Sequence, residues 1–445
     1  ARGAMPSRSD SPRCAVELAW WASPHAPGRK AVAVALSFVL VAGVGSLAGC
    51  SSDLGGGESA AGVAVDGGEA DSSGSASDSG EAASFAEVAA AFDASALDLD
   101  YSKRDTDASY DDASAVHIVL GGGSASVEGN GATVDGSTVT ITAEGVYVVS
   151  GSLDDGQLAV EAPEDAKVQI VLAGATIHNE DGPAVYVKQA DKCFITLADG
   201  TQNALTDGAE YVLEDGSDEP YATLFSRADL TLNGTGALTV TSAYRHAVCS
   251  KDDLVITGGT YVVNAVEDAL RGRDCVKIAD GDFTLIAGGD GIKSNKDTKA
   301  TKGFVSIDGG TFVIEAGDDG IHAQTYLRIA GGDISIAAVD DALHSNLEGL
   351  LAGGALDIEA GDDAFHVETK LVIDDGTVNV KACYEGYEAE KLYINGGDTH
   401  IVAQRRRHQC GCRRSRRRRC RRGGRCVGRG ARLRGRGAAR RHGGA

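Results

Sequence analysis

Hydrophobic and polar residues alternate in short stretches from about residue 113 to about residue 403. Stretches such as TYVVNA (260–265), TFVIEA (311–316) and ALDIEA (355–360) follow a glycine and place an apolar residue at every second position. This period of two is typical of a β-strand with one buried face. A second apolar stretch, such as VSIDGG or LRIAGG, leads back to the next glycine. The pattern therefore predicts many similar units, each with two or three short strands.

These units recur at a fixed interval, which a pair of acidic residues marks. The second acid of each pair is Asp268, Asp290, Asp319, Asp341, Asp363 or Glu385, with separations of 22, 29, 22, 22 and 22 residues. The longer interval contains SNKDTKATKG (294–303), which we interpret as a seven-residue loop insertion. Strand-rich repeats of this length with glycine corners are typical of β-helices, whereas helical repeats are longer. We predict an all-β fold, a right-handed parallel β-helix with coils of about 22 residues, over 113–403.

Composition and charge agree with this fold and exclude some functions. The 60 glycines, 7 prolines and 5% aromatic residues favour short strands and tight turns. Of the 42 Lys and Arg residues, 18 are arginines between positions 405 and 441, where no acid occurs. The rest of the chain has 24 basic against 64 acidic residues, a formal net charge of -40. Such a chain repels nucleic acids and anionic membranes and attracts cations.

The N-terminal residues indicate export. Residues 28–50 contain two basic residues, an apolar run and LAGC, which resembles a bacterial lipoprotein signal with Cys50 as the lipidated residue. A cleaved secretory signal is the alternative. Residues 1–27 are interpreted as read-through or a misplaced start, and residues 51–112 as a flexible acidic tether with a short helix at 85–92. We therefore expect an extracellular protein that is anchored to the bacterial membrane by lipid.

The arginine-rich tail, residues 404–445, departs from the repeat. Its opening residues RRRHQCG can be encoded by DNA that, shifted by one base, reads Asp-Asp-Ala-Ile-Asn-Ala and would continue the repeat. We therefore predict out-of-frame translation, and the alternative is an arm that binds an anionic polymer. The four cysteines of the body, Cys193, Cys249, Cys275 and Cys383, are scattered, which predicts buried single thiols.

The acid pairs are the main candidate site. Equivalent residues of a parallel β-helix lie above one another, so the pairs form two columns, and like charges under about 5 Å apart are destabilising unless compensated. Calcium would compensate them, because it takes six to eight oxygen ligands. The predicted calcium ligands are Asp268, Asp290, Asp318, Asp319, Asp340, Asp341, Asp362, Asp363 and Glu385.

A third column of residues would also compensate the acids. The residues three positions after each second acid are Arg271, Lys293, His322, His344, His366 and Glu388. Salt bridges and hydrogen bonds from its basic members would balance the acids without metal, or the histidines would bind a transition metal. The basic members of this column are also predicted ligand contacts. Tyr384 and Tyr387 are predicted to stack on sugar rings, although strand packing would account for them too.

Several longer segments resemble one family. They are ITLADGTQNALTDG (195–208), FSRADLTLNGTGALTV (225–240), SKDDLVITGG (250–259), GGDGIKSN (288–295) and YEGYEA (384–389). They resemble bacterial surface carbohydrate-binding domain proteins, whose fold is a pectate-lyase-like right-handed parallel β-helix. The resemblance implies calcium and a polysaccharide partner, an acidic or plant cell-wall glycan, and it does not imply catalysis. Arg245, His246 and Glu267 depart from the family pattern, which weakens the upstream turn as a metal site.

Three classes of function remain open. The first is a non-catalytic, calcium-dependent polysaccharide-binding protein, which we expect. The second is a calcium-assisted polyuronate lyase in which Lys293 or Arg271 removes a proton. The third is a surface scaffold or adhesin that binds another protein.

Overall fold

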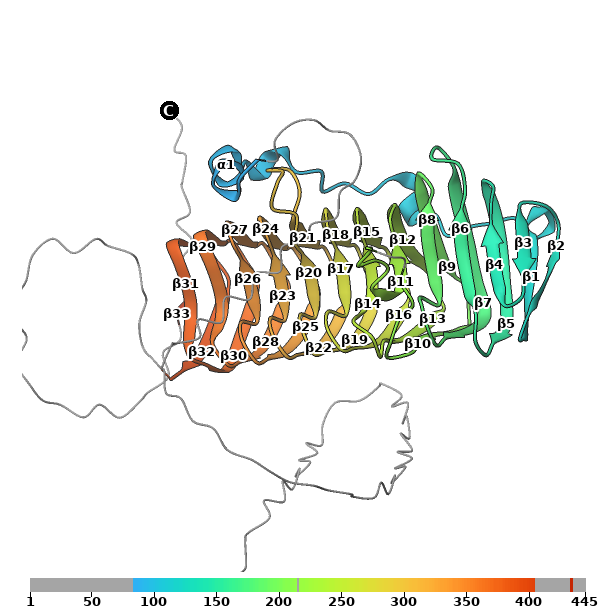
Figure 1. Cartoon of the computed structure of the whole chain (residues 1–445). Coiled ribbons are helices and arrows are strands. Elements are labelled where there is room, and N and C mark those ends of the chain that lie inside the picture. The colour runs from blue at the N-terminus through green and yellow to red at the C-terminus, as the bar shows by residue number, and fades with distance from the viewer. Residues whose placement is uncertain (1–82, 214–215, 405–432, 435–445) are drawn as a thin grey trace, which may run out of the picture. The chain divides into compact units, whose positions relative to one another are not determined.

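The computed structural model describes residues 83–213, 216–404 and 433–434, which form a parallel β-solenoid of about 11 turns. The coils stack along one axis from β1 (Val116–Gly122) to β32 (Asp398–Ala403) (Figure 1). The predicted all-β parallel β-helix is therefore confirmed. No helix in the described part of the chain is long and apolar enough to cross a membrane.

Each central coil has three strands, and each strand pairs in parallel with the same strand of the next coil, giving three strand stacks. The first stack consists of β10 (Gln202–Asp207), β13 (Ala237–Thr241), β16 (Thr260–Ala265), β19 (Asp282–Ala287), β22 (Thr311–Ala316), β25 (Asp333–Ala338), β28 (Ala355–Ala360), β30 (Thr377–Cys383) and β32. The second stack consists of β8 (Val185–Gln189), β11 (Ala222–Ser226), β14 (His246–Ser250), β17 (Leu270–Gly272), β20 (Ile292–Ser294), β23 (Ile321–Ala323) and β26 (Leu343–Ser345). The third stack consists of β9 (Lys192–Leu197), β12 (Asp229–Gly234), β15 (Asp253–Ile256), β18 (Cys275–Ile278), β21 (Phe304–Ile307), β24 (Tyr326–Ile329) and β27 (Glu348–Leu351).

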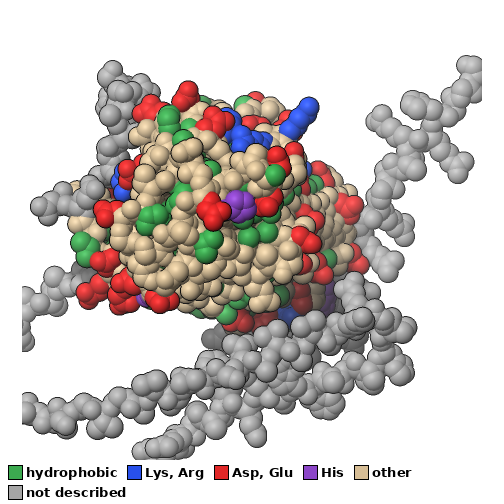
Figure 2. All heavy atoms as spheres, turned by 90° about the vertical axis from the view of Figure 1, so that its right-hand side faces the viewer, with side chains coloured by type: hydrophobic (Ala, Val, Ile, Leu, Met, Phe, Trp, Pro, Cys, Tyr) green, Lys and Arg blue, Asp and Glu red, His purple; other side chains and the backbone are tan. Residues whose placement is uncertain are grey.

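The two ends of the solenoid depart from this scheme. At the C-terminal end, β29 (Asp363–Ile373) and β31 (Glu385–Ile394) run through both the second and the third stack, and β33 (Leu433–Arg434) pairs antiparallel with β32. At the N-terminal end, β1 and β3 form antiparallel pairs with β2 and β4. The bounds there are β2 (Ala125–Glu128), β3 (Ala132–Asp135), β4 (Thr138–Ile141), β5 (Gly145–Leu153), β6 (Gln157–Glu161) and β7 (Lys167–Asn179). Acidic side chains are spread around this end, and basic ones are confined to a few places (Figure 2).

The core lies inside the coils, where apolar residues of equivalent positions stack on each other. Ile314, Ile336 and Ile358 form one such column and are at most 2% exposed. Phe283 and Phe312 stack with ring centroids 4.6 Å apart. Each fully buried side chain of this kind contributes about 1.5–3 kcal/mol, so the repeat itself supplies the stability. The four body cysteines are buried and free, which confirms that prediction.

A glycine directly before each first-stack strand from β13 to β32 makes the close stacking possible. Gly310, Gly332 and Gly354 have φ values of 100°, 100° and 91°, a region that favours glycine. A Cβ atom on Gly332 would also lie 3.1 Å from the carbonyl oxygen of Gly310 in the previous coil. The glycine marker seen in the sequence therefore reflects both backbone conformation and coil spacing.

Residues 83–112, here called the strap, lie across the third stack (Figure 1). The strap contains α1 (Phe85–Ala91), the 3-10 helix Ala94–Ala96 and α2 (Lys103–Thr106), and the 3-10 helix Asp112–Ser114 follows at its end. Leu97 packs with Phe304 and Tyr326, and the buried Asp105 carboxylate lies 2.7 Å from the Lys192 amine. These contacts correct the predicted tether over residues 83–112, because Val88, Leu97 and Asp105 of this segment are buried. The expected helix near residue 85 is confirmed.

The other predicted segments lie outside the described residues. They are residues 1–27, the signal with Cys50, the tether over 51–82, and the arginine-rich tail apart from Gln404 and β33. The predictions for them remain predictions. The described structure therefore bears on the solenoid and its strap.

Candidate functional site

The acid pairs lie in the turns that join the first strand stack to the second. In the turn between β22 and β23, Asp318 is exposed and Asp319 is 4% exposed. The next two turns repeat this arrangement, with Asp340 and Asp362 exposed and with Asp341 and Asp363 buried. The two predicted columns are therefore both present. They differ in environment, and we call them the outer column and the inner column.

The inner column is held together by hydrogen bonds to the backbone. The N–H of Asp341 donates to Oδ1 of Asp319 at 3.0 Å, and the N–H of Asp363 donates to Oδ1 of Asp341 at 2.8 Å. The same bond links Asp268 to Asp290, Asp290 to Asp319 and Asp363 to Glu385. One carboxylate oxygen of each inner aspartate therefore accepts a hydrogen bond from the next coil and links the two coils.

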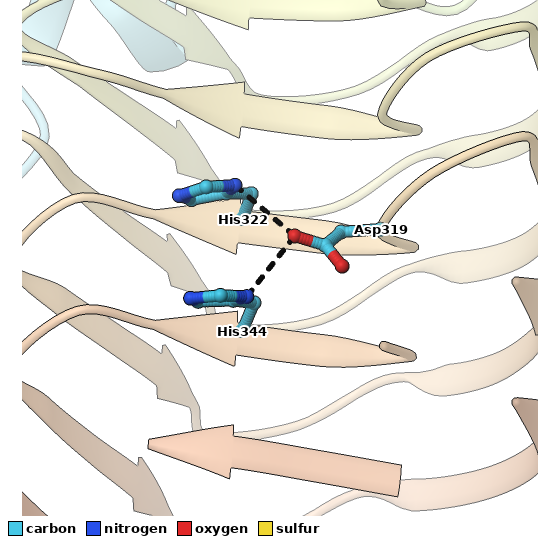
Figure 3. A group of neighbouring side chains, drawn as sticks. All are labelled: Asp319, His322 and His344. Carbon is cyan, nitrogen blue, oxygen red and sulfur yellow. Dashed lines mark ion pairs between the residues drawn. The ribbon is translucent and has the colours of Figure 1, made fainter. Parts of the chain in front are cut away.

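The second oxygen of the inner aspartates faces the histidine column. Oδ2 of Asp319 lies 3.1 Å from Nδ1 of His322 and 3.2 Å from Nδ1 of His344 (Figure 3). Oδ2 of Asp341 lies 3.2 Å from Nδ1 of His344 and 3.0 Å from Nδ1 of His366. The imidazole rings stack at 4.5 and 4.7 Å between centroids. These are the contacts that compensation without metal requires.

Proton affinities in this region follow from the contacts. Burial alone would raise the pKa of Asp319, but its hydrogen bonds with His322 and His344 outweigh burial and hold this pKa well below its usual range. Burial also opposes protonation of His344, yet its bonds with Asp319 and Asp341 raise its pKa to about 10. The hydrogen bond with Asp341 raises the pKa of His366 to about 9. These two histidines are therefore cationic at neutral pH.

Toward the N-terminal end, Lys293 and Arg271 take the place of histidine. Nζ of Lys293 lies 2.6 Å from Oδ2 of Asp290, and a guanidinium nitrogen of Arg271 lies 3.3 Å from Oδ2 of Asp268. His246 takes the place of an inner acid one coil before Asp268, and its Nδ1 accepts the N–H of Asp268. Burial lowers the pKa of His246 to about 3, so its ring is neutral and can accept. The basic residues predicted as ligand contacts thus serve as counter-charges of the inner acids.

The outer column has a different chemistry. Carboxylate oxygens of Asp318, Asp319 and Asp340 lie within 4.8 Å of one another, and so do those of Asp340, Asp341 and Asp362. The stacked histidines form ion pairs with inner acids, and His366 also pairs with Glu368. Within residues 83–213 and 216–404, none of these histidines forms an ion pair with an outer acid. Burial and the neighbouring carboxylates raise the pKa of Asp340. The outer column is therefore an exposed row of uncompensated hard oxygen donors.

At the C-terminal end, the column of basic residues that starts at Arg271 ends with an acidic residue. Glu388 pairs in register with His366, and a carboxylate oxygen of Glu388 lies within 4.8 Å of one from Asp363 and one from Glu385. Burial, a hydrogen bond with Glu388 and the charge of Asp341 raise the pKa of Asp363 to about 7. Sequence reasoning named Asp363 and Glu385 as metal ligands but missed Glu388. Its signal was that it is the one acid in a column of bases.

The tyrosines only partly follow the prediction. Tyr387 is 6% exposed and packs edge to face on Phe365. Because its ring is buried, the prediction that Tyr387 contacts a sugar is corrected. Tyr384 is 39% exposed, and its N–H donates to the carbonyl of Asp362. Sequence reasoning did not find Tyr211 and Tyr244, whose rings stack at 4.2 Å. They are 33 positions apart, and no local pattern links them.

Comparison with known proteins gives matches to one family and to one fold. The model of the carbohydrate-binding domain-containing protein family matches residues 135–405. A curated member from Acetivibrio thermocellus is 38% identical over 119 residues, which is 26% of this chain and 42% of that relative, so the match spans less than half of the relative. The solved structure of a polysaccharide lyase-like protein from C. thermocellum, a gadolinium derivative, is 31% identical. That match covers 62% of this chain and all of that chain, with a TM-score of 0.50.

The family match includes the whole row of acidic turns from Asp268 to Glu385. It also covers most of the solenoid, which agrees with the fold of the solved relative. The chain therefore belongs to the carbohydrate-binding domain-containing protein family.

Proposed function

We propose that this protein binds a polysaccharide along the outer column, that calcium takes part in the binding, and that the protein acts outside the cell as a non-catalytic, lipid-anchored binder. One observation carries the proposal: a carbohydrate-binding family member presents three exposed carboxylates, Asp318, Asp340 and Asp362, without basic partners among the described residues. The anchor at Cys50 rests on the signal-like sequence.

Calcium fits the outer column better than the inner one. Oxygens of the inner Asp319 and Asp341 are already bonded to backbone N–H groups and to histidines. The outer carboxylates are exposed, consist of hard oxygen donors and repel one another, which is the chemistry that calcium favours. Neighbouring outer acids would hold calcium ions between successive coils, Asp318 with Asp340 and Asp340 with Asp362. Bound calcium would offer open coordination positions to sugar hydroxyl or carboxylate groups.

The strap supports placing the glycan on this side of the solenoid. It packs against third-stack residues, among them Cys275, Phe304 and Tyr326, and Tyr101 donates to Asp308 at 2.8 Å. That stack is therefore covered by the chain itself. The turns of the outer column are exposed, and Tyr384, whose N–H donates to the carbonyl of Asp362, is 39% exposed. A polymer lying along the coil axis would meet these groups one after another.

A lyase is the second candidate, because the solved relative is described as polysaccharide lyase-like. A lyase needs a base that can lose its proton near neutral pH. Burial lowers the pKa of Lys293, but Asp290 and Asp268 outweigh it and the net effect raises this pKa. Arg271 is likewise paired with Asp268. The residues expected to act as base are therefore poorly suited to it, which favours binding over cleavage.

Asp318→Asn/Asp340→Asn/Asp362→Asn is expected to weaken glycan binding at least tenfold, equivalent to about 1.4 kcal/mol, because it removes the charge of the outer column. Binding of polygalacturonate and of cellulose would be measured by affinity electrophoresis in calcium and in chelator. The matched control is Glu315→Gln/Asp333→Asn/Glu359→Gln, which removes three exposed acids of the first stack. Equal retention of the two variants would refute the site, and unsaturated products seen by ultraviolet absorbance would favour the lyase.

A further inference from the structure

The row of turns that carries the outer column extends beyond it toward the N-terminal end. Backbone hydrogen bonds, each from the N–H of one coil to the carbonyl of the coil before it, link the equivalent turn position of seven coils. Its members are Arg245, Glu267, Gly289, Asp318, Asp340, Asp362 and Tyr384. Adjacent parallel strands lie about 4.8 Å apart, so Arg245 stands about 14 Å before Asp318 in the same row.

At the start of this row the charges are already paired. Nε of Arg245 donates to both carboxylate oxygens of Glu267, at 3.0 and 2.9 Å. Both side chains are half-buried. This end of the row therefore lacks the excess of hard oxygen donors that attracts calcium. A sugar unit that lies here would need contacts of another kind.

Two tyrosines offer such contacts. Tyr244 directly precedes Arg245, and its ring stacks on that of Tyr211, with centroids 4.2 Å apart and planes 18° from parallel. Tyr211 comes from the loop between β10 and β11, and both tyrosines are half-buried. Val266 and Val339 occupy the position of Tyr244 in later coils and are 53% and 69% exposed. The side of the row next to the charged positions is therefore partly apolar.

A buried carboxylate holds the two rings in place. Asp207 is 5% exposed, and its Oδ2 accepts the hydroxyl of Tyr211 at 2.6 Å. Its Oδ1 accepts the N–H of Ala243, the residue before the second ring, at 2.6 Å. The hydroxyls of Thr223 and Ser242 also donate to Oδ2, at 2.8 and 3.2 Å. The loop and the turn are thus tied to one acid, which positions the rings before a ligand binds.

We propose that Tyr211 and Tyr244 form a stacking subsite for a pyranose ring of the bound polysaccharide. The apolar C–H face of a sugar ring packs on flat aromatic side chains, and a few polar groups beside it fix its orientation. The subsite deepens the proposed glycan binding and depends on it, because one polymer would meet both these rings and the outer column. A polymer that spans both gains affinity, because the second contact forms within the same complex.

Affinity electrophoresis of the full chain in polygalacturonate and in hydroxyethylcellulose, with calcium or with chelator, tests the subsite. Tyr244→Ala is expected to weaken binding of both polymers about three- to tenfold, because it removes a stacking contact. The factor should be the same in calcium and in chelator, because the tyrosines lie too far from the outer acids to couple with them. Asp318→Asn/Asp340→Asn/Asp362→Asn is instead expected to weaken binding only in calcium.

Three more variants separate stacking from folding. Tyr244→Phe keeps the ring and is expected to bind like the wild type. Tyr244→Leu keeps an apolar side chain against Tyr211 without a flat ring, so it should lose binding even if Tyr244→Ala does not fold. Tyr393→Ala removes a 50% exposed tyrosine of β31 and should have no effect. Wild-type affinity in Tyr244→Ala or Tyr244→Leu would overturn the subsite alone, whereas a wild type that binds neither polymer would overturn the proposed function as well.

Discussion

Asp341→Ala is expected to destabilise the protein by about 3–5 kcal/mol, because it removes one half of a buried ion pair. In the folded protein, Oδ2 of Asp341 lies 3.2 Å from Nδ1 of His344 and 3.0 Å from Nδ1 of His366, while Oδ1 accepts the N–H of Asp363. The substitution leaves these donors without that acceptor in a site where Asp341 is 3% exposed. Urea unfolding followed by circular dichroism, in chelator, would measure the loss.

The neighbouring residue supplies the control. Asp340→Ala removes an exposed acid from the same turn and is expected to change stability by less than about 0.5 kcal/mol. Asp341→Asn should fall between the two, because the amide oxygen still accepts the N–H of Asp363 but the charge is lost. If Asp341→Ala were no more destabilising than Asp340→Ala, the inner column would not hold the coils together.

Raising the pH from 6.5 to 10 is expected to cost the protein about 4 kcal/mol of stability through His344 and His366. The folded-state pKa values are about 10 for His344 and about 9 for His366, above the ordinary value of 6.5. The folded state thus binds these protons more tightly, so the stabilisation is complete below pH 6.5 and is lost as pH rises through 9 and 10. A tenfold change in proton affinity is worth about 1.4 kcal/mol, and we take about half of the full value to allow for solvent screening.

The histidines can be separated from other groups that titrate. Asp363, with its pKa raised to about 7, costs stability between its ordinary value of 3.8 and pH 7. Burial raises the pKa of Cys193 and Cys249 to about 12, so these thiols cost stability as pH rises past their ordinary value of 9.0. The loss between pH 7 and about 8.5 therefore belongs to the histidines.

At the acid end, the pKa of Asp341 is lowered, and its stabilisation is lost as pH falls below 3.8. Thermal melts from about pH 2 to pH 10 in chelator would show the profile. His344→Gln/His366→Gln should flatten the part between pH 7 and about 8.5, and an unchanged slope there would contradict the assignment.

Much of the fold was predictable because the repeat is local. Strands such as Thr260–Ala265 and Thr311–Ala316 were predicted from alternation alone, and the structure has them as β16 and β22. The strap was missed, because its order depends on distant partners: Asp105 meets Lys192, and Tyr101 meets Asp308. A composition rich in small and acidic residues indicates a flexible segment unless such partners exist.

The candidate site was predictable as a set of columns but not in its chemistry. Spacing placed Asp319 under Asp341 and His322 under His344, which the strand register confirms. Spacing did not reveal that the inner oxygens are already bonded, or that Tyr387 points into the core. Burial and hydrogen bonding depend on which way each turn residue faces, and adjacent acids in a turn face opposite ways.

The sequence by itself determined the coil length, the strands and the residues that stack, because a parallel solenoid converts a constant spacing into direct neighbours. Only the tertiary structure decided that the inner acids are buried and compensated, that the outer acids are exposed, and that Asp363, Glu385 and Glu388 form a cluster without a base. The reason is that charge compensation is set by side-chain direction and solvent access across coils. The spacing of residues along the sequence specifies neither the direction of a side chain nor its access to solvent.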